Sequence, residues 1–197
     1  MVNGRYARRA RLTAAALLVL AGSAAAQTPA GPAPDPELRQ ALVNAVGQAD
    51  SFANRFEAEV WLLDMSTRLA RRLPDAERRL TLLRAVHREA ALAGLKPELV
   101  LAVIHVESAF NRFAISSAGA RGLMQVMPFW MDEIGRPEDN LFDLDTNLRY
   151  GCTILRFYLD KEDGNLSRAL ARYNGSLGQY WYPARINTAL RRHWYPQ

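Results

Sequence analysis

One stretch constrains the fold of this chain more than any other. Residues 99–106, LVLAVIHV, are apolar almost throughout and are followed directly by Glu107 and Ser108. A helix that is hydrophobic on every side is usually buried at the centre of a protein. Carboxylates are seldom buried without a partner, because removing the charge from water costs several kcal/mol. We therefore expect a buried helix over residues 98–108 that holds one carboxyl group at its end.

The position of Glu107 at the end of this helix suits a general acid. The carboxyl end of a helix carries partial negative charge, and burial disfavours ionisation further. Both effects predict a raised pKa for Glu107, so that its carboxyl group keeps a proton near neutral pH and can donate it. The hydroxyl of Ser108 is expected to orient a neighbouring group or to cap the turn.

The first 26 residues have the pattern of a secretory signal peptide. A basic stretch with four arginines precedes a short apolar core at residues 12–22, and Ala24, Ala25 and Ala26 provide the small residues that cleavage requires. This core is shorter than the roughly 20 residues that cross a bilayer; an uncleaved anchor is the alternative. We expect cleavage near Ala26 and a mature protein without a membrane span, periplasmic or secreted.

The charge balance argues against nucleic acid as a partner. The whole chain has 25 lysines and arginines against 20 aspartates and glutamates. The predicted signal peptide holds four of these arginines and no acidic residue, so its removal leaves 21 against 20. A protein that binds nucleic acid needs a basic surface in its mature form, and we expect no nucleic-acid partner here.

The sequence lacks the usual signatures of metal and cofactor sites. Cys152 is the one cysteine, so it cannot form an internal disulfide, and it lies far from the predicted cleavage site, where a lipid-bearing cysteine would be needed. His87, His105 and His193 do not have the spacing of metal ligands. There is no glycine-rich phosphate loop, and Ser108 has no histidine base within its own motif. We expect neither a metal nor a cofactor.

The organisation along the chain predicts a mainly helical fold. Residues 27–36, QTPAGPAPDP, form a Pro/Ala linker, and residues 37–94 form an N-terminal helical region in which one helix starts at Asp75. These N-terminal helices either pack on the rest of the chain or recruit an envelope or secretion complex. Beyond Glu107 the sequence is rich in loops, and further helices are expected over residues 145–159 and 166–173.

A segment after the apolar helix offers groups that suit a sugar ligand. Residues 119–125, GARGLMQ, combine glycines with the thioether of Met124 and the amide of Gln125. Glycine permits close approach of the backbone to a ligand, and an amide both donates and accepts hydrogen bonds. This composition suits an N-acetyl sugar. A tight turn with Met124 in the core is the alternative.

Aromatic residues toward the end of the chain could serve the same ligand. Tyr173 and Asn174 follow a predicted short helix, and Trp130 and residues 180–182 add aromatic faces. Aromatic rings are the usual platforms for sugar rings, but they also fill protein cores. A core position for Tyr173 is therefore the alternative.

Three motifs follow one another in the order of a known family: Glu107-Ser108, then GLMQ at residues 122–125, then Tyr173-Asn174. The chain resembles the catalytic domain of the soluble lytic transglycosylases from about residue 95 to about residue 182. The resemblance implies a lysozyme-like fold with little or no β structure, over residues 95–197. It also implies cleavage of the β-1,4 bond between N-acetylmuramic acid and N-acetylglucosamine in peptidoglycan, leaving 1,6-anhydromuramic acid ends.

The resemblance implies a role for each of the matching residues. Glu107 acts as the acid and then as the base, and Ser108 hydrogen-bonds close to it. Tyr173 directs its hydroxyl toward the glutamate, and Asn174 supports that corner. The sugar groove is lined by the central motif, through Gly122, Met124 and Gln125.

One carboxylate is enough for the implied reaction. Most glycosidases need two, but substrate-assisted enzymes use a group of the substrate instead. Here the N-acetyl group would stabilise the developing cation, and the 6-hydroxyl of the same muramic acid would complete the displacement. Asp143 and Asp145 are the only nearby candidates for a second carboxylate, and we expect Asp145 to cap a helix. A goose-type lysozyme, with water as the nucleophile, and a peptidoglycan-binding scaffold without activity are the alternatives.

Two parts of the sequence depart from the family pattern. The chain has YNGSLG at residues 173–178 where the family often has YNAGPG, so Ser176 and Leu177 alter the turn after Tyr173. Ile154 stands where many members have a tyrosine that contacts the sugar. These departures affect the expected substrate affinity, whereas Glu107 is unchanged.

Overall fold

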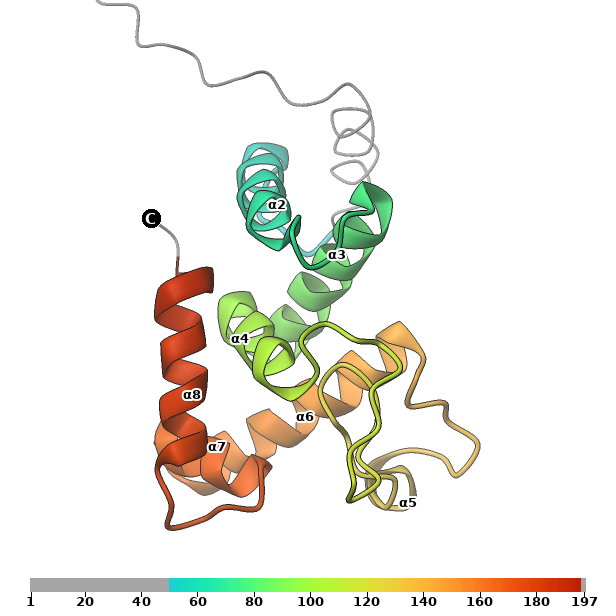
Figure 1. Ribbon diagram of the computed structural model, residues 1–197, viewed down its shortest axis with the longest axis vertical. Helices are drawn as coiled ribbons and strands as arrows, with labels where there is room; N and C mark the ends of the chain where they lie inside the picture. Colours follow the sequence, from blue (N-terminus) through green and yellow to red (C-terminus); the bar gives the residue numbers. More distant parts are fainter. Residues whose placement is uncertain (1–49, 196–197) are drawn as a thin grey trace, which may run out of the picture. The chain divides into compact units, whose positions relative to one another are not determined.

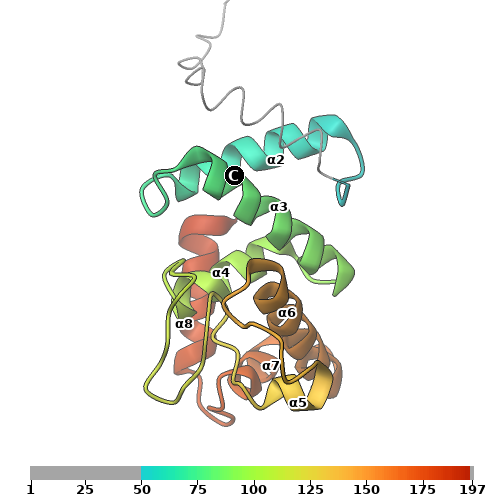
Figure 2. The ribbon, with the colours of Figure 1, turned by 90° about the vertical axis from the view of Figure 1, so that its right-hand side faces the viewer.

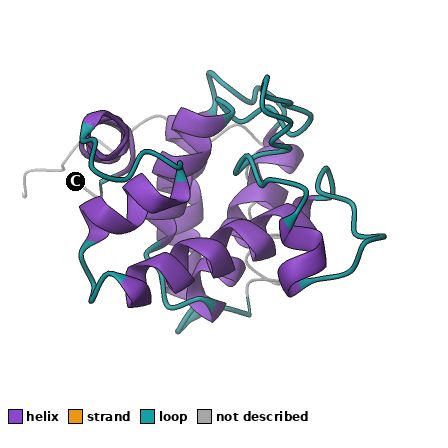
Figure 3. Ribbon diagram, turned by 90° about the horizontal axis from the view of Figure 1, so that it is seen from below, coloured by secondary structure: helices purple, strands orange, loops and turns teal. Residues whose placement is uncertain are grey.

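The computed structural model describes residues 50–195, and within them the chain is helical. The predicted signal peptide, the linker and residues 37–49 lie outside the described residues. The helices are α2 (Arg55–Leu69), α3 (Ala76–Leu92), α4 (Pro97–Glu107), α5 (Trp130–Ile134), α6 (Leu144–Lys161), α7 (Leu166–Tyr173), α8 (Trp181–Ala189) and the π-helical turn η1 (Leu190–Trp194). Helices and loops account for all of the coloured ribbon in Figure 3. The only β structure of the described part is a pair of isolated bridges that Arg121 forms with Ile115 and Val126. The mainly helical fold predicted from the sequence is confirmed.

Helix α4 lies at the centre of the other helices, with α8 on one side of it and α3 and α6 on the other (Figure 1). Pro97 occupies its first turn, where a missing N–H costs nothing. The six residues after Glu98 are all buried, and five of them are completely so. Full burial of one large aliphatic side chain contributes about 1.5–3 kcal/mol. The apolar run therefore forms the centre of the core, as predicted, and fixes the position of the helix end at Glu107.

Helices α2 and α3 pack across one end of the bundle formed by the other helices (Figure 2). Each begins with a side-chain cap, since Asn54 accepts from the N–H of Glu57 and Asp75 accepts from the N–H of Arg78. The start of α3 at Asp75 confirms the prediction. Helix α2 contributes Leu62, Met65 and Leu69 to the same core as α4. Whether residues 37–94 form a separate region stays a prediction.

Helix α6 begins after the loop-rich segment that follows α4, and it packs against α3. Its N-cap is Asp143, which accepts from the N–H of Thr146 at 3.1 Å. The expectation that Asp145 caps this helix is wrong, because Asp145 already lies in the first turn and instead pairs with Arg88 of α3 at 2.6 Å. A second link between α3 and α6 is the buried carboxylate of Glu89, which accepts from Arg149 at 3.4 Å. Neither Asp143 nor Asp145 thus makes a hydrogen bond or ion pair to Glu107.

No helix within residues 50–195 combines the length and the apolar character that crossing a bilayer requires.

Candidate active site

Glu107 is the last residue of α4, and its half-buried side chain meets α8. The Tyr182 hydroxyl donates a hydrogen bond to its Oε1 at 2.5 Å. Burial raises the pKa of Glu107 above its ordinary value of 4.5, and the Tyr182 hydrogen bond and the charge of Arg185 offset part of this rise. The direction agrees with the raised pKa predicted from the sequence, and burial is its largest cause.

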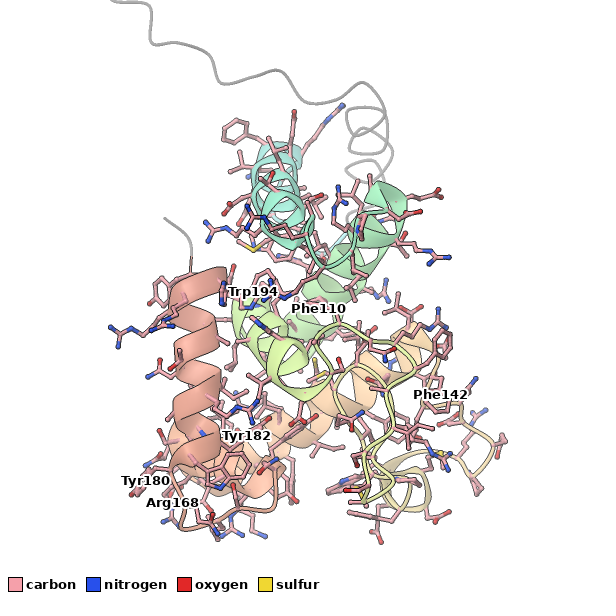
Figure 4. All side chains as sticks on the ribbon, viewed as in Figure 1. Phe110, Phe142, Arg168, Tyr180, Tyr182 and Trp194 are labelled. Atoms are coloured by element: carbon pink, nitrogen blue, oxygen red, sulfur yellow. The ribbon has the colours of Figure 1, made fainter. Side chains whose placement is uncertain are left out.

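Tyr182 lies in the first turn of α8, on the side that faces α4 (Figure 4). Its side chain is 1% exposed, whereas Tyr180, two residues earlier, is 77% exposed and points away from the bundle. Burial and the nearby charge of Glu107 raise the pKa of Tyr182 well above its ordinary value. The phenol therefore keeps its proton and acts as a hydrogen-bond donor to the carboxylate, not as an exposed platform for a sugar ring.

The Tyr173 hydroxyl donates to a different acceptor from the one that the resemblance implied. It donates to the carbonyl oxygen of Met124 at 2.7 Å. The hydrogen bond of this hydroxyl goes to Met124 and not to Glu107, because the turn at residues 122–125 brings that carbonyl within reach. The charge of Glu107 still acts on the phenol: burial first, and then this charge, raise the pKa of Tyr173 well above its ordinary value.

The GLMQ segment is a tight turn held by Asn147 of α6. Gly122 has φ +78°, and a Cβ at this position would lie 2.3 Å from Asn147 Nδ2 and 2.5 Å from the carbonyl oxygen of Leu141. Asn147 is buried and accepts from the N–H of Met124 at 2.8 Å. The same side chain donates to the carbonyls of Arg121 and Leu141. Only glycine fits at residue 122, and one amide side chain fixes the whole turn.

Gln125 completes this turn and keeps one polar atom available. Its Nε2 donates to the carbonyls of Gly122 at 2.9 Å and Ala114 at 3.2 Å. No described residue donates to its Oε1. The residue adopts φ +50°, a conformation that a non-glycine residue rarely takes. An acceptor that is held in place in this way can receive a hydrogen bond from a hydroxyl or an N-acetyl N–H of a ligand.

Met124 is fully buried, so the expectation that it lines a sugar groove is wrong. Its side chain packs against Gly151 of α6, where an added Cβ would lie 2.4 Å from the sulfur. The alternative that the sequence left open, a core methionine below a tight turn, describes its position.

Ser108 joins the end of α4 to the GLMQ segment. Its hydroxyl lies 2.8 Å from the carbonyl of Leu123 and 3.2 Å from that of Ile104, and its backbone caps the helix. The Ser108 hydroxyl therefore bonds backbone carbonyls and not the Glu107 carboxylate, and it fixes the backbone that carries Glu107.

The remaining predicted positions lie around the turn after α7. Asn174 is the C-cap of α7. Ser176 is buried and its hydroxyl has no hydrogen-bond partner among the described residues, while Leu177 is 44% exposed. Ile154 is 3% exposed and lies in the core. A side chain at residue 154 therefore faces the interior. An aromatic residue at this position would not contact a sugar in this fold, so Ile154 removes no such contact.

Comparison with known proteins identifies this arrangement of residues. The family model described as Transglycosylase SLT domain matches residues 84–192. This chain belongs to the Transglycosylase SLT domain family. The SLT domain thus begins within α3, ends within η1, and includes Glu107, the GLMQ turn and both tyrosines. The resemblance stated from the three sequence motifs is confirmed.

Individual relatives share the SLT domain but are longer. A transglycosylase of Enterobacteria phage PRD1 is 37% identical over 90 residues, which cover 46% of this chain and 33% of the relative. A membrane-bound lytic murein transglycosylase C of Yersinia pestis is 31% identical over 109 residues, or 47% of this chain and 30% of the relative. The chain thus spans about a third of the length of the curated relatives it matches. An inactive mutant of lytic transglycosylase Slt from Pseudomonas aeruginosa is 26% identical, with a TM-score of 0.45, over 79% of this chain and 31% of the other.

Sequence reasoning missed three residues of the site in the SLT domain. The sequence motifs indicate Tyr182 only as an aromatic face and do not include Asn147 or Arg185. Tyr182 and Arg185 are three residues apart in one helix, so their spacing in the sequence already indicates that they share a face. Asn147 follows its N-cap, Asp143, by one helical turn, but nothing in the local sequence indicates what its amide contacts.

Among the described residues of the SLT domain and the helices before it, no group of three or more histidine, cysteine, aspartate or glutamate side chains could hold a metal ion. The thiol of Cys152 is buried, and burial raises its pKa out of the reactive range.

Proposed function

We propose that this protein is a lytic transglycosylase that cleaves the glycan strands of peptidoglycan, with Glu107 as its single catalytic carboxyl group. The observation that carries the proposal is the environment of Glu107: a raised pKa, a buried tyrosine as hydrogen-bond donor, and no ion pair with any described arginine or lysine. Membership of the SLT family supports this activity. The names of the relatives indicate murein as the substrate class.

The proposed reaction uses the two oxygens of Glu107 differently. Tyr182 donates to Oε1, so in the protonated acid Oε2 is the oxygen that carries the proton. Oε2–H gives this proton to the glycosidic oxygen as the bond to C1 of the muramic acid breaks, and N-acetylglucosamine leaves with a new hydroxyl group. The N-acetyl carbonyl of the muramic acid stabilises the cation at C1. The Tyr182 hydrogen bond and the charge of Arg185 stabilise the carboxylate that results.

The same carboxylate then acts as the base. It removes the proton of the 6-hydroxyl, and the oxygen of that group forms a bond to C1, which closes the 1,6-anhydro ring. Glu107 regains its proton and no water is consumed. Asp143 and Asp145 already hold the N–H of Thr146 and the guanidinium of Arg88, so neither is proposed as a second carboxylate.

The turn around Gln125 is the proposed contact for the sugar. The free Oε1 of Gln125 would bind an N-acetyl sugar, and Asn174 and Tyr173 would border the same region, whereas Gly122 is buried against Asn147. Residues 1–26 would direct the protein across the inner membrane, so that it meets its substrate in the periplasm. An envelope or secretion complex that binds the N-terminal helices is a further proposal, which rests on the sequence alone.

The test is digestion of purified sacculi followed by mass spectrometry of the released muropeptides. Wild-type protein should release products with anhydro ends, and Glu107→Gln should release none. Products that end mainly in reducing sugars, one water heavier, would favour a goose-type lysozyme instead. Protein that sediments with sacculi but releases nothing would favour the scaffold.

A further inference from the structure

The turn that follows Glu107 is built from residues that rarely adopt its conformation. Ala109 has φ +48° and Phe110 has φ +68°, and the N–H of Asn111 donates to the carbonyl of Ser108 at 2.9 Å. Positive φ at both central positions is the pattern of a type I′ turn, in which glycine, asparagine and aspartate dominate. An alanine and a phenylalanine occupy these positions here, so contacts outside the turn must hold it in place.

The ring of Phe110 is the part of this turn that the core holds. Phe110 is 4% exposed, and it makes a T-shaped contact with the indole of Trp194, with 5.4 Å between the ring centroids (Figure 4). Trp194 is completely buried, and its indole N–H donates to Nδ1 of His105 in α4 at 3.3 Å. Trp194 therefore contacts α4 through His105 and the turn after α4 through Phe110.

Helix α2 fixes the π-helical turn η1, which carries Trp194. The Arg68 side chain of α2 donates to the carbonyls of His193 at 3.2 Å and Tyr195 at 3.1 Å. These two residues flank Trp194 in the sequence, and the ion pair of Arg68 with Asp64, at 2.7 Å, orients the guanidinium. Carbonyls at the end of a helix lack partners within it, so Arg68 donates where the helix itself does not. Arg68 thus links α2 to the position of Trp194.

These contacts join parts of the chain that lie outside the family match at both of its ends. The match covers residues 84–192, so α2 precedes it and Trp194 follows it. Both nevertheless act on the turn at residues 108–111. Its first residue, Ser108, is also the C-cap of α4, so a change in the turn moves the helix end that carries Glu107.

We propose that Trp194, held by Arg68, is a positioning residue: it keeps the turn at residues 108–111 in its strained conformation and thereby fixes the carboxyl group of Glu107. The inference rests on the proposed function, because Glu107 is the residue to which the reaction is assigned. It gives α2, a helix that precedes the SLT domain, a part in holding the active site in place. Tight packing of Trp194 without this role would affect stability but not the properties of Glu107.

The first test compares kcat and KM on peptidoglycan strands for three variants. Trp194→Ala removes the ring that supports Phe110, and kcat should fall about tenfold or more with KM unchanged, because displacing a catalytic group slightly is costly. Trp194→Phe keeps an aromatic ring and should stay within about threefold of the wild type. Arg191→Gln is the control, since Arg191 is exposed in the same π-helical turn. A rise in KM at unchanged kcat, or equal effects of all three substitutions, would overturn the proposal.

A second substitution separates positioning from a general loss of stability. Glycine adopts positive φ without strain, so Ala109→Gly lets the turn form with less support. In the Trp194→Ala background it should restore kcat to within about threefold of the wild type. Tm should stay low, because the cavity left by the indole remains. A kcat that Ala109→Gly does not restore would overturn the proposal.

Arg68→Gln provides the same test if Trp194→Ala does not fold. The indole then stays in place, but η1 loses the two hydrogen bonds that Arg68 donates. We expect kcat to fall about threefold, the size of a typical hydrogen bond, and to recover when Ala109→Gly is added. An unchanged kcat in Arg68→Gln, or a loss that Ala109→Gly leaves in place, would contradict the link through α2.

A direct titration of Glu107 keeps this inference separate from the proposed function. Carbon-13 NMR follows the Glu107 carboxyl group against pH in the full-length wild type and in Trp194→Ala, or in Arg68→Gln if the former does not fold. Three groups that interact with Glu107 are the same in all of these proteins: Tyr182, Arg185 and Tyr173.

Release of the turn lets water reach the carboxyl group, so the pKa of Glu107 should fall toward 4.5 in the variant. An unchanged pKa in the folded variant would overturn the inference even if the enzyme is active. Wild-type protein without activity on sacculi would contradict the proposed function alone, because the titration needs no substrate.

Discussion

The Tyr182 hydroxyl donates a hydrogen bond to Oε1 of Glu107 at 2.5 Å, and it joins the first turn of α8 to the last residue of α4. This contact leaves Oε2 as the oxygen that can carry the acidic proton. It also partly offsets the rise in the pKa of Glu107 that burial causes. This hydrogen bond therefore joins the end of α4 to the start of α8 at the place where the proposed reaction occurs.

Tyr182→Phe should lower kcat on sacculi about tenfold to a hundredfold, because a hydrogen bond to a charged group contributes about 1.5–3 kcal/mol. Loss of the bond also raises the pKa of Glu107, so the alkaline limb of the pH–rate profile should move to higher pH. Tyr180→Phe is the matched control, since Tyr180 is 77% exposed and should leave both quantities unchanged. Equal effects of the two substitutions would contradict this role for Tyr182.

Glu107→Gln should stabilise the protein at neutral pH but not at low pH. The folded-state pKa of Glu107 is raised above 4.5. The stability that this group contributes is therefore present at pH values below 4.5 and is lost as the pH rises through the folded-state pKa. Glutamine carries no charge at any pH, so the Glu107→Gln variant does not lose stability in this way. The difference in Tm between variant and wild type should thus grow as the pH rises above 4.5. A difference that shrinks over this range would contradict the assignment.

Glu89 provides the opposite case within the same chain. It is 2% exposed and pairs with Arg88 and Arg149, as expected of a structural carboxylate. Glu89→Gln should lower the free energy of unfolding at neutral pH by about 1–2 kcal/mol, a figure reduced because both arginines are largely exposed. Chemical denaturation measures this change. A stable Glu89→Gln protein would show that the Glu89 ion pairs contribute little.

Asn147→Ala should destabilise the protein by about 3 kcal/mol or more. The substitution leaves the N–H of Met124 and the carbonyl of Leu141 unpaired, while the carbonyl of Arg121 keeps the N–H of Val126. Each buried polar group left unpaired costs about 1–3 kcal/mol. Asn187→Ala is the control, because Asn187 is exposed in α8. Equilibrium unfolding in urea compares the two variants. A change below about 0.5 kcal/mol for Asn147→Ala would mean that the GLMQ turn does not depend on this amide.

Gly122→Ala and Gly119→Ala separate backbone strain from steric clash in the same loop. Both glycines have positive φ, but only at Gly122 would a Cβ overlap a neighbour, Asn147 Nδ2 at 2.3 Å. Gly122→Ala should therefore reduce both stability and activity more than Gly119→Ala, by about 1–3 kcal/mol in stability. Thermal melting measures the difference. Equal destabilisation would show that conformation alone requires glycine at residue 122.

The part of the site that the sequence predicted lies on α4. A run of apolar residues that ends in one glutamate can be recognised locally, and the predicted helix over residues 98–108 agrees with Pro97–Glu107. The helix predicted over residues 166–173 has the bounds observed for α7. The error over Asp143 and Asp145 concerns two aspartates two positions apart, either of which could begin α6. Such a boundary depends on which side chain reaches a free N–H.

The contacts of the tyrosines could not be predicted, because they depend on how distant helices pack. Tyr173 and Tyr182 both lie at helix ends near aromatic or polar residues in the sequence. Only the packing of α7 against α6, and of α8 against α4, decides that Tyr173 donates to Met124 and Tyr182 to Glu107. The burial of Met124 depends in the same way on Gly151, a residue in another helix. Motifs therefore identified the site, whereas the geometry within it came from the structure.

The central claim is that the 6-hydroxyl of muramic acid, and not water, completes the reaction at Glu107. Digestion of sacculi in water enriched in the heavy oxygen isotope, followed by mass spectrometry of the new glycan ends, tests it directly. Our account predicts anhydro ends that contain no heavy oxygen, together with the loss of all new ends in Glu107→Gln. New reducing ends that carry the heavy isotope at C1 would show that water is the nucleophile and would contradict the account.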